Sequence, residues 1–447
     1  MTKSTNQFLK PITTTINNQG NLDIGGCDLV ELAEKYETPL YVIDEKTLRN
    51  ICSDYKEAFG KYPKTKMVYA AKALCTSAIM KILDEEGFGF DTVSLGEIYT
   101  AHNAKVDMKK ILFNGNNKSY DEMEAALEYG VGRFSVDNFY ELALLNEIAL
   151  TKKTKADILL RITPGIECHT HEYIQTGHLD SKFGFDLTQI DEAIELIQNE
   201  YKNLVLHGLH AHVGSQIFET NIFSDEIEIM AREISRIEKT YGLKLNEINI
   251  GGGLGVKYIE QDAPPSTFEI ADIIINKINE VVEKYNIEPP SIFLEPGRSI
   301  ISTAGVTLYT IGSSKQVPHG TKYISVDGGM ADNPRPSMYQ AEYSAQIANK
   351  KDIFKTEKVT IAGRYCESGD ILIKDIELPQ PEEGDIICVY NTGAYNYSMA
   401  SNYNRVGRSA MVLVNNSESE IIVRRETLED LVSHDLIPNR LKNERNI

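Results

Sequence analysis

Eight apolar, strand-like runs alternate with helical segments, and this alternation restricts the fold more than any other feature of the sequence. Most of the intervening segments have helical character; Ile190, Ala193, Ile194 and Ile197, for example, follow the i, i+3, i+4, i+7 spacing of a buried helix face. Eight such units over roughly 250 residues are what a closed α/β barrel, the (β/α)₈ fold, requires. A doubly wound open sheet is the competing fold, because periodicity does not show closure. The runs are 67–73, 89–93, 111–114, 133–136, 157–162, 205–213, 247–251 and 291–295.

The chain on either side of this region predicts a second, all-β domain. Beyond Thr303, β-branched runs separated by turns replace the alternation. They lie at 306–311, 322–326, 358–361, 386–390, 410–414 and 420–424. The first part of the chain predicts a helix at 27–35, a strand at 39–43 and a helix at 45–59. We therefore expect an N-terminal segment (1–40) that joins the β domain, a barrel over 41–302, and a C-terminal β domain over 303–447.

Composition and charge exclude several classes of partner. The chain has 42% hydrophobic and 25% charged residues, as ordinary globular proteins have. Its formal net charge of -19 argues against nucleic acid and anionic membranes, but not against a small anionic ligand. No apolar run reaches transmembrane length, and the start, MTKSTNQFLKPITTT, lacks the apolar core of a signal peptide. Six scattered cysteines without a C-x-x-C pair are typical of the reducing cytoplasm, where we expect this protein.

Polar residues collect at the C-terminal ends of the predicted barrel strands, where barrel enzymes carry their active sites. Lys72 ends the first run, Asp91 stands in the second, and Glu295 ends the eighth. A buried lysine is costly to desolvate unless it has a partner or a chemical role, and burial lowers the pKa of the amine, which favours Schiff-base chemistry. Lys72 alone is better explained by a stem that lies along the strand while the amine reaches solvent.

Later strand ends add groups that suit a phosphorylated, aromatic ligand. The glycine run 251–255 follows a strand, and its backbone N–H groups could close on a phosphate, although a turn without a ligand is the alternative. Ser215 could bind the same phosphate, and His212 has a flat ring that could stack on the ligand. Glu295 could hold a proton on a ring nitrogen, or simply pair with Arg298. Lysine, acid, imidazole and phosphate cradle together are the contacts that pyridoxal 5′-phosphate needs.

Cys168-His169-Thr170-His171 makes a weaker case for a metal site. Two histidines separated by one residue can share a face of a strand, but no acid or thiol stands at a familiar ligand spacing. The surrounding segment, 164–181, is rich in polar residues and glycine and is expected to form a long functional loop. We therefore expect no metal.

Together these motifs resemble the diaminopimelate decarboxylases, pyridoxal-phosphate enzymes of the alanine-racemase-like fold (fold type III). The resemblance runs from Thr38 to Leu431 and is carried by HEYIQTGHLDSKFG, GLHAHVGSQ, GGGLG, EPGRS, CESGD and GAYNYSMASNYN. It implies decarboxylation of meso-2,6-diaminopimelate to L-lysine and carbon dioxide, the last step of lysine biosynthesis. It also implies a homodimer in which the partner subunit completes each active site. A related decarboxylase acting on carboxynorspermidine, D-ornithine or D-lysine and a non-catalytic relative that binds the cofactor are the alternatives.

The resemblance also assigns roles by matching motif. Lys72 would carry the cofactor, while Cys366 would supply a proton and Glu367 would bind the distal amine, both from the partner subunit. Two arginines aimed at one distal carboxylate suit a substrate with an amino acid at both ends. Asn114 stands where relatives often carry histidine, and it has no assigned contact. Cofactor contacts would come from Lys72, Asp91, His212, Ser215, Gly251, Gly252, Gly253, Glu295, Gly297, Arg298 and Tyr395, and substrate contacts from Arg298, Arg335, Tyr339, Glu367 and Tyr395.

Overall fold

The expected eight strands form a closed parallel barrel in the computed structural model, which describes residues 3–165, 181–350 and 355–442. Each strand pairs with the next around the ring, and the last, β13, pairs with the first, β5. The closed barrel is therefore confirmed, and the doubly wound open sheet is excluded. Its strands are β5 (Thr65–Ala70), β6 (Gly89–Thr92), β7 (Ile111–Phe113), β8 (Arg133–Val136), β9 (Ala156–Thr163), β11 (Leu204–His210), β12 (Glu247–Asn249) and β13 (Ser291–Leu294); the short β10 (Phe185–Asp186) extends the edge of β9.

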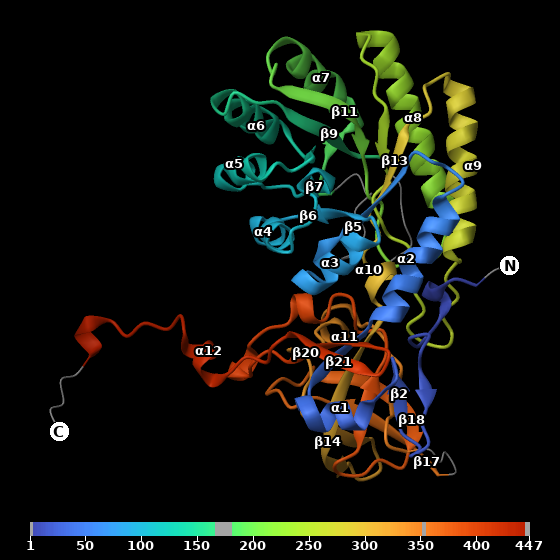
Figure 1. The fold of residues 1–447 in the computed structure, drawn as a ribbon, viewed down its shortest axis with the longest axis vertical. Coiled ribbons are helices and arrows are strands. Elements are labelled where there is room, and N and C mark those ends of the chain that lie inside the picture. The colour runs from blue at the N-terminus through green and yellow to red at the C-terminus, as the bar shows by residue number, and fades with distance from the viewer. Residues whose placement is uncertain (1–2, 166–180, 351–354, 443–447) are drawn as a thin grey trace.

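Helices cover the outside of the barrel (Figure 1). The four apolar residues predicted to face the core from 190–197 are all buried in α7. Ser94, Ser119, Asn138 and Ser266 cap the starts of four helices by accepting backbone N–H groups, which fixes where the loops at the barrel mouth end. The helices are α2 (Glu45–Phe59), α3 (Ser77–Glu85), α4 (Leu95–Asn103), α5 (Tyr120–Tyr129), α6 (Phe139–Thr151), α7 (Ile190–Asn199), α8 (Asn221–Tyr241) and α9 (Thr267–Tyr285).

The second sheet runs in the order β18-β17-β15-β14-β4-β20-β21, and β19 joins β14 to β16. The strand predictions from the sequence did not include β16 and β18. In β18 the register of pairing with β17 shifts twice, so burial does not alternate along the strand and the period-two pattern is lost. The strands that follow the barrel are β14 (Gly305–Gln316), β15 (Lys322–Val326), β16 (Ala345–Ile347), β17 (Thr356–Ala362), β18 (Ile371–Pro379), β19 (Ile386–Val389), β20 (Ala410–Asn415) and β21 (Glu418–Val423).

Strand β4 (Leu40–Asp44) lies inside the second sheet, between β14 and β20. The boundary expected between residues 40 and 41 falls within this strand, so the barrel begins with α2. Before it, β1 (Thr15–Ile16), β2 (Leu22–Ile24) and β3 (Cys27–Asp28) form a small sheet. Apolar residues of α1 (Leu29–Tyr36) share a core with β14 and β20. The N-terminal segment therefore joins the β domain, as expected, while the remaining domain boundary stays a prediction.

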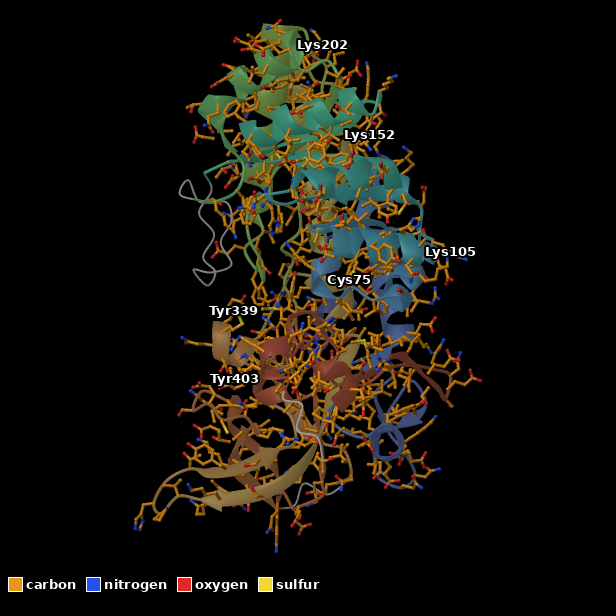
Figure 2. All side chains as sticks on the ribbon, turned by 90° about the vertical axis from the view of Figure 1, so that its left-hand side faces the viewer. Cys75, Lys105, Lys152, Lys202, Tyr339 and Tyr403 are labelled. Atoms are coloured by element: carbon orange, nitrogen blue, oxygen red, sulfur yellow. The ribbon has the colours of Figure 1, made fainter. Side chains whose placement is uncertain are left out.

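Figure 1 shows the barrel on one side and the second sheet on the other, with the C-terminal segment and α12 (Leu428–Val432) extending away from both. The short helices α10 (Arg298–Ile301) and α11 (Arg335–Tyr339) lie where the two parts meet. Figure 2 places the labelled Tyr339 and Tyr403 near the same junction. None of the helices in the described part of the chain is both long and apolar enough to cross a membrane.

Buried Asp332 should couple stability to pH. Its carboxylate accepts hydrogen bonds from the Tyr309 hydroxyl at 2.5 Å and the Gly329 N–H at 3.0 Å, yet burial raises its pKa to about 7. A carboxyl group whose pKa is raised by folding contributes its full stabilisation at pH values below its pKa in the unfolded chain. That stabilisation is lost as the pH rises through the pKa of the group in the folded protein. We expect Asp332→Asn to raise the free energy of unfolding by about 2 kcal/mol more at pH 8 than at pH 5, measured by urea denaturation. An equal effect at both pH values would contradict this assignment.

Candidate active site

A cavity of about 760 Å³ opens at the C-terminal ends of the barrel strands. Residues of the second domain, among them Arg335, Tyr339 and Tyr395, complete its wall. A smaller chamber of about 50 Å³ shares part of this lining. The structure therefore brings most of the predicted site residues together. Both spaces are lined by Lys72, Asp91, His212, Ser215, Glu295, Arg298 and Tyr395.

Lys72 lies in a single helical turn just after β5, rather than at the end of the strand. Its side chain has a large accessible area, but that area faces the cavity. Among the described residues it forms no hydrogen bond or salt bridge. Burial lowers the pKa of Lys72, but Tyr395, Asp91 and Glu295 outweigh burial and raise that pKa above its usual value. The expected lowering is therefore wrong, because acidic groups around the cavity stabilise the ammonium ion.

Glu295, directly after β13, lies at the centre of a buried polar network. Its Oε1 accepts hydrogen bonds from Asn249 Nδ2 at 2.7 Å and Asn114 Nδ2 at 3.2 Å. His210 Nε2 lies 3.3 Å from Glu295 Oε2, and His210 Nδ1 lies 2.6 Å from Ser135 Oγ. Burial raises the pKa of Glu295, but His210 and Asn249 outweigh burial and lower that pKa to about 2. The carboxylate is therefore ionised at neutral pH.

Asn114 bridges Glu295 to a second carboxyl group. Its Nδ2 also donates to Asp91 Oδ1 at 2.5 Å. Burial, followed by the charge of Glu295, raises the pKa of Asp91 to about 8, so the two carboxyl groups share one negative charge near neutral pH. Asn114, to which the sequence assigned no contact, is therefore part of the site. Its amide has one N–H for each carboxyl group.

His212 and the glycine run pack against each other. The backbone N–H of Gly252 donates to His212 Nδ1 at 3.2 Å, so Nε2 carries the ring proton. Burial lowers the pKa of His212 well below its usual value, which leaves the ring neutral. Gly251 has φ +60°, and a Cβ there would lie 2.7 Å from His212 Nδ1. A Cβ on Gly252 would lie 2.2 Å from the Glu295 carbonyl oxygen, so close packing requires glycine at both positions.

Arg298 and Arg335 are buried, and no carboxylate in the described ranges pairs with either of them. Arg298 Nη2 donates to Ser215 Oγ at 2.9 Å and Nη1 donates to Tyr258 Oη at 2.8 Å, while its buried Nε has no partner among those residues. Arg335 Nη1 donates to Tyr343 Oη at 2.6 Å. Because an uncompensated buried charge is costly, two such cations lining one cavity indicate anionic ligands.

Three further predicted residues take up positions in the wall. Gly297 packs so closely on Ala70 that an added Cβ would lie 3.0 Å from the alanine Cβ. Gly253 lines the smaller chamber, and the backbone N–H of Tyr395 donates to the Ala73 carbonyl oxygen at 2.9 Å. The second domain is thereby tied directly to the turn that carries the predicted catalytic lysine.

Cys366 and Glu367 do not line the cavity of their own chain. Cys366 is exposed, and its backbone N–H donates to Asn404 Oδ1 at 2.9 Å. Their roles in a neighbouring subunit stay predictions.

The suggested metal motif at 168–171 lies outside the described residues, as does most of the predicted long loop. Within 3–165, 181–350 and 355–442, no group of three or more His, Cys, Asp or Glu side chains could hold a metal ion.

Sequence reasoning missed four residues of the site. Asn249 and His210 contact Glu295, and Arg161 lines the cavity with its guanidinium 4.3 Å from the Phe183 ring. These three stand at strand ends, so treating every polar residue there as a candidate would have found them. The fourth, Tyr258, follows the glycine run in a loop and has no periodic signal.

The donor set fits pyridoxal 5′-phosphate. The cavity offers a lysine amine, an ionised carboxylate and a neutral imidazole. Beside them, the small chamber is lined by Ser215, Gly252, Gly253 and Arg298, whose N–H and O–H groups suit a phosphate. The buried Arg298 Nε, which has no protein partner in the described residues, would be satisfied by a phosphate oxygen.

Comparisons with known proteins agree with this chemistry. Residues 46–302 match the family model described as pyridoxal-dependent decarboxylase, pyridoxal binding domain. The chain is 47% identical to the diaminopimelate decarboxylase of Synechocystis sp., over 98% of this chain and 95% of that protein. It is also 47% identical to that of Bacillus subtilis, over 95% and 97%. The solved diaminopimelate decarboxylase of M. jannaschii in complex with L-lysine has a TM-score of 0.91 and 36% identity, covering 97% of this chain and 100% of that one. The chain therefore belongs to the diaminopimelate decarboxylase family of pyridoxal-dependent decarboxylases.

Proposed function

We propose that the chain decarboxylates meso-2,6-diaminopimelate to L-lysine and carbon dioxide, the last step of lysine biosynthesis, with pyridoxal 5′-phosphate as cofactor. The observation that carries this proposal is the pair of buried arginines without carboxylate partners in the described residues. The cofactor phosphate would neutralise part of the charge of the two arginines, on the side of Arg298 and Ser215, and the charge that remains on Arg298 and Arg335 requires a second anion. A substrate that loses one carboxylate as carbon dioxide and binds Arg335 through another must carry two carboxylates. Lysine and ornithine carry only one carboxylate. The similarity to diaminopimelate decarboxylases favours diaminopimelate over the alternative substrates.

The proposed roles follow from the contacts in the cavity. When bound, pyridoxal phosphate supplies an electron-poor ring that accepts the electron pair released as a carboxylate leaves. Lys72 would hold the cofactor covalently, and Glu295, kept ionised by its donors, would hold a proton at the ring nitrogen. His212 is neutral, and its flat ring would stack on the cofactor. Arg298, Arg335 and Tyr339 would orient the distal carboxylate of the substrate.

A panel of amino acids tests this function. Purified enzyme loaded with cofactor should release carbon dioxide from meso-2,6-diaminopimelate and not from lysine or ornithine, which lack the second carboxylate. Carboxynorspermidine and the D-configured basic amino acids complete the panel. Absence of release from meso-2,6-diaminopimelate, with release from another member, would replace the proposed substrate.

An exposed apolar arm supports the proposal that the enzyme is a homodimer. The arm, residues 428–441, extends away from the body of the chain (Figure 1). Leu428, Leu436 and Ile437 are 77%, 91% and 64% exposed. Arg405 fixes the start of the arm by donating to the Leu431 carbonyl oxygen at 2.7 Å. Large apolar side chains concentrated on one projecting segment favour burial against another protein surface, which a second copy would provide.

In the proposed dimer, Cys366 and Glu367 act in the cavity of the partner subunit. Cys366 supplies the proton that replaces the lost carboxylate, and Glu367 binds the distal amine. Both belong to an exposed turn of the second domain, which is free to contact another chain. A dimer of this kind has two identical active sites, each built from both subunits.

Mixing two inactive variants tests this arrangement. We expect Lys72→Ala and Cys366→Ala each to lack activity, and a refolded equal mixture to recover about a quarter of the wild-type rate. Random assortment makes about half of the dimers mixed, and each mixed dimer holds one intact site. Lys72→Ala mixed with a Lys72→Ala/Cys366→Ala double variant is the matched control and should stay inactive. No recovery in the first mixture would mean that each chain completes its own site.

We also propose a cytoplasmic location. Cys27, Cys52, Cys75, Cys366 and Cys388 are all free thiols. Free thiols are typical of a reducing compartment. Fractionation of cells that express a tagged chain would test this location.

A further inference from the structure

Tyr258 stands between the two arginines of the cavity. Its hydroxyl accepts the hydrogen bond from Arg298 Nη1 at 2.8 Å, and the Arg335 guanidinium lies 4.9 Å from the centre of its ring. The ring also meets Tyr343, the hydrogen-bond acceptor of Arg335, edge to face at 5.2 Å. One side chain therefore contacts both cations, with its oxygen on one side and its ring on the other.

The backbone around Tyr258 is held independently of its hydroxyl. Gln216 Oε1 accepts the Val256 N–H at 3.1 Å, and Gln216 Nε2 donates to the Val256 carbonyl oxygen at 2.7 Å. The N–H groups of Tyr258 and Ile259 both donate to Asp262 Oδ2, at 2.8 and 3.1 Å. The ring itself is 5% exposed and packs in the core of the second sheet. Removal of the hydroxyl should therefore leave the ring in place.

This arrangement reduces the repulsion between the two arginines. Two guanidinium groups near each other repel, and burial removes the water that would screen them. The ring face attracts Arg335, and the hydroxyl oxygen neutralises part of the charge on Arg298. Burial raises the pKa of Tyr258, but Arg298 and Arg335 outweigh burial and lower that pKa below its usual value. The oxygen is therefore a strong acceptor for the arginine N–H.

We propose that Tyr258 is a positioning residue that holds Arg298 and Arg335 in the arrangement needed to bind the distal carboxylate of the substrate. This inference rests on the proposed function and deepens it, because it names a side chain that sets the preference for a substrate with two carboxylates. A preorganised pair of cations loses less free energy on binding than a pair that must first be brought together. Tyr258 thus acts through the arginines and touches no reacting atom.

Tyr258→Phe tests the proposal, because it removes the oxygen and keeps the ring. With saturating cofactor, we expect the KM for meso-2,6-diaminopimelate to rise about tenfold and kcat to change less than about threefold, as for loss of one hydrogen bond to a charged group used in binding. Inhibition by heptanedioate, which has two carboxylates and no amine, should weaken by a similar factor. Inhibition by 1,5-diaminopentane, which has no carboxylate, should be unchanged.

Tyr62→Phe is the matched control, since the Tyr62 hydroxyl donates to the Pro290 carbonyl oxygen at 2.7 Å, far along the chain from the glycine loop. Tyr62→Phe should leave the KM for meso-2,6-diaminopimelate and the inhibition by both compounds unchanged. An unchanged KM in Tyr258→Phe, a fall confined to kcat, or equal weakening of both inhibitors would each overturn the proposal. Failure of the proposed function can be told apart, because the wild-type enzyme would then release no carbon dioxide from meso-2,6-diaminopimelate. In that case, calorimetry would still measure whether Tyr258→Phe binds heptanedioate more weakly than the wild type does.

Discussion

Lys72→Ala is expected to lower the rate of carbon dioxide release by roughly a thousandfold or more while the protein stays folded. Lys72 faces the cavity and forms no hydrogen bond or salt bridge with the described residues, so its loss leaves no protein group without a partner. The visible absorbance of cofactor bound to lysine should disappear as well. Stopped assays of carbon dioxide, an absorbance spectrum and thermal unfolding measure the three effects. Partial rescue by added methylamine would support a chemical role for the lost amine.

Lys118→Ala provides the matched control, because Lys118 is a second lysine near the barrel mouth and, unlike Lys72, is buried with partners. Its Nζ lies 2.7 Å from Glu141 Oε1 and donates to the carbonyl oxygens of Gly115 and Ser135 at 2.6 and 2.9 Å. Removing one partner of a buried ion pair costs about 3–5 kcal/mol, so this variant should lose stability. Lys72→Ala with the same loss of stability would show that Lys72 is structural.

Glu295→Gln is expected to lower kcat by about 100-fold to 1,000-fold. Glutamine has nearly the same shape, but its neutral amide cannot keep a proton on a ring nitrogen through charge. Glutamine can keep its carbonyl oxygen as the acceptor for Asn249 and Asn114, and its amide N–H groups then replace the carboxylate oxygen that lies 3.3 Å from His210 Nε2. Without the neighbouring charge, the pKa of Asp91 should fall from about 8, and the pH profile of kcat should change shape. Steady-state kinetics across pH measure both effects.

Glu247→Gln is the control for that variant. Glu247 is a buried glutamate in β12, and its two carboxylate oxygens accept from Arg133 Nε and Nη2 at 3.0 and 2.9 Å. It stands at the start of its strand, at the opposite end of the barrel from the cavity. We expect this variant to lose stability with kcat nearly unchanged. A similar fall of kcat in both variants would show that Glu295 acts only by supporting the barrel.

The barrel could be predicted because parallel strands are buried on both faces and so form continuous apolar runs. Their exact ends could not be predicted. The run 205–213 ends as a strand at His210, and Ala211 and Val213 stay buried in the loop that follows. In β18, the shifts in register remove the pattern on which strand prediction depends.

The cofactor could be predicted from residue types at strand ends, but the network around it could not. The partners of Glu295 lie at the ends of β11 and β12 and directly after β7; these strands are far apart in the sequence and meet only when the barrel closes. Asn114 illustrates the limit: its position was evident, whereas its two hydrogen bonds depend on the spacing of two carboxyl groups in space. The pKa of Lys72 was misjudged for the same reason.

Strand β4 has a consequence for how the chain is made. It leaves the ribosome before the barrel, yet its two neighbours, β14 and β20, are synthesised after the barrel. All five of its residues are buried in the finished sheet, so it must remain unpaired and apolar while the barrel emerges. Contacts between such distant segments form slowly, and an unpaired apolar strand invites aggregation. Expression of the barrel alone, with β4 attached, should therefore give insoluble protein, and a shortened chain should begin after Asp44.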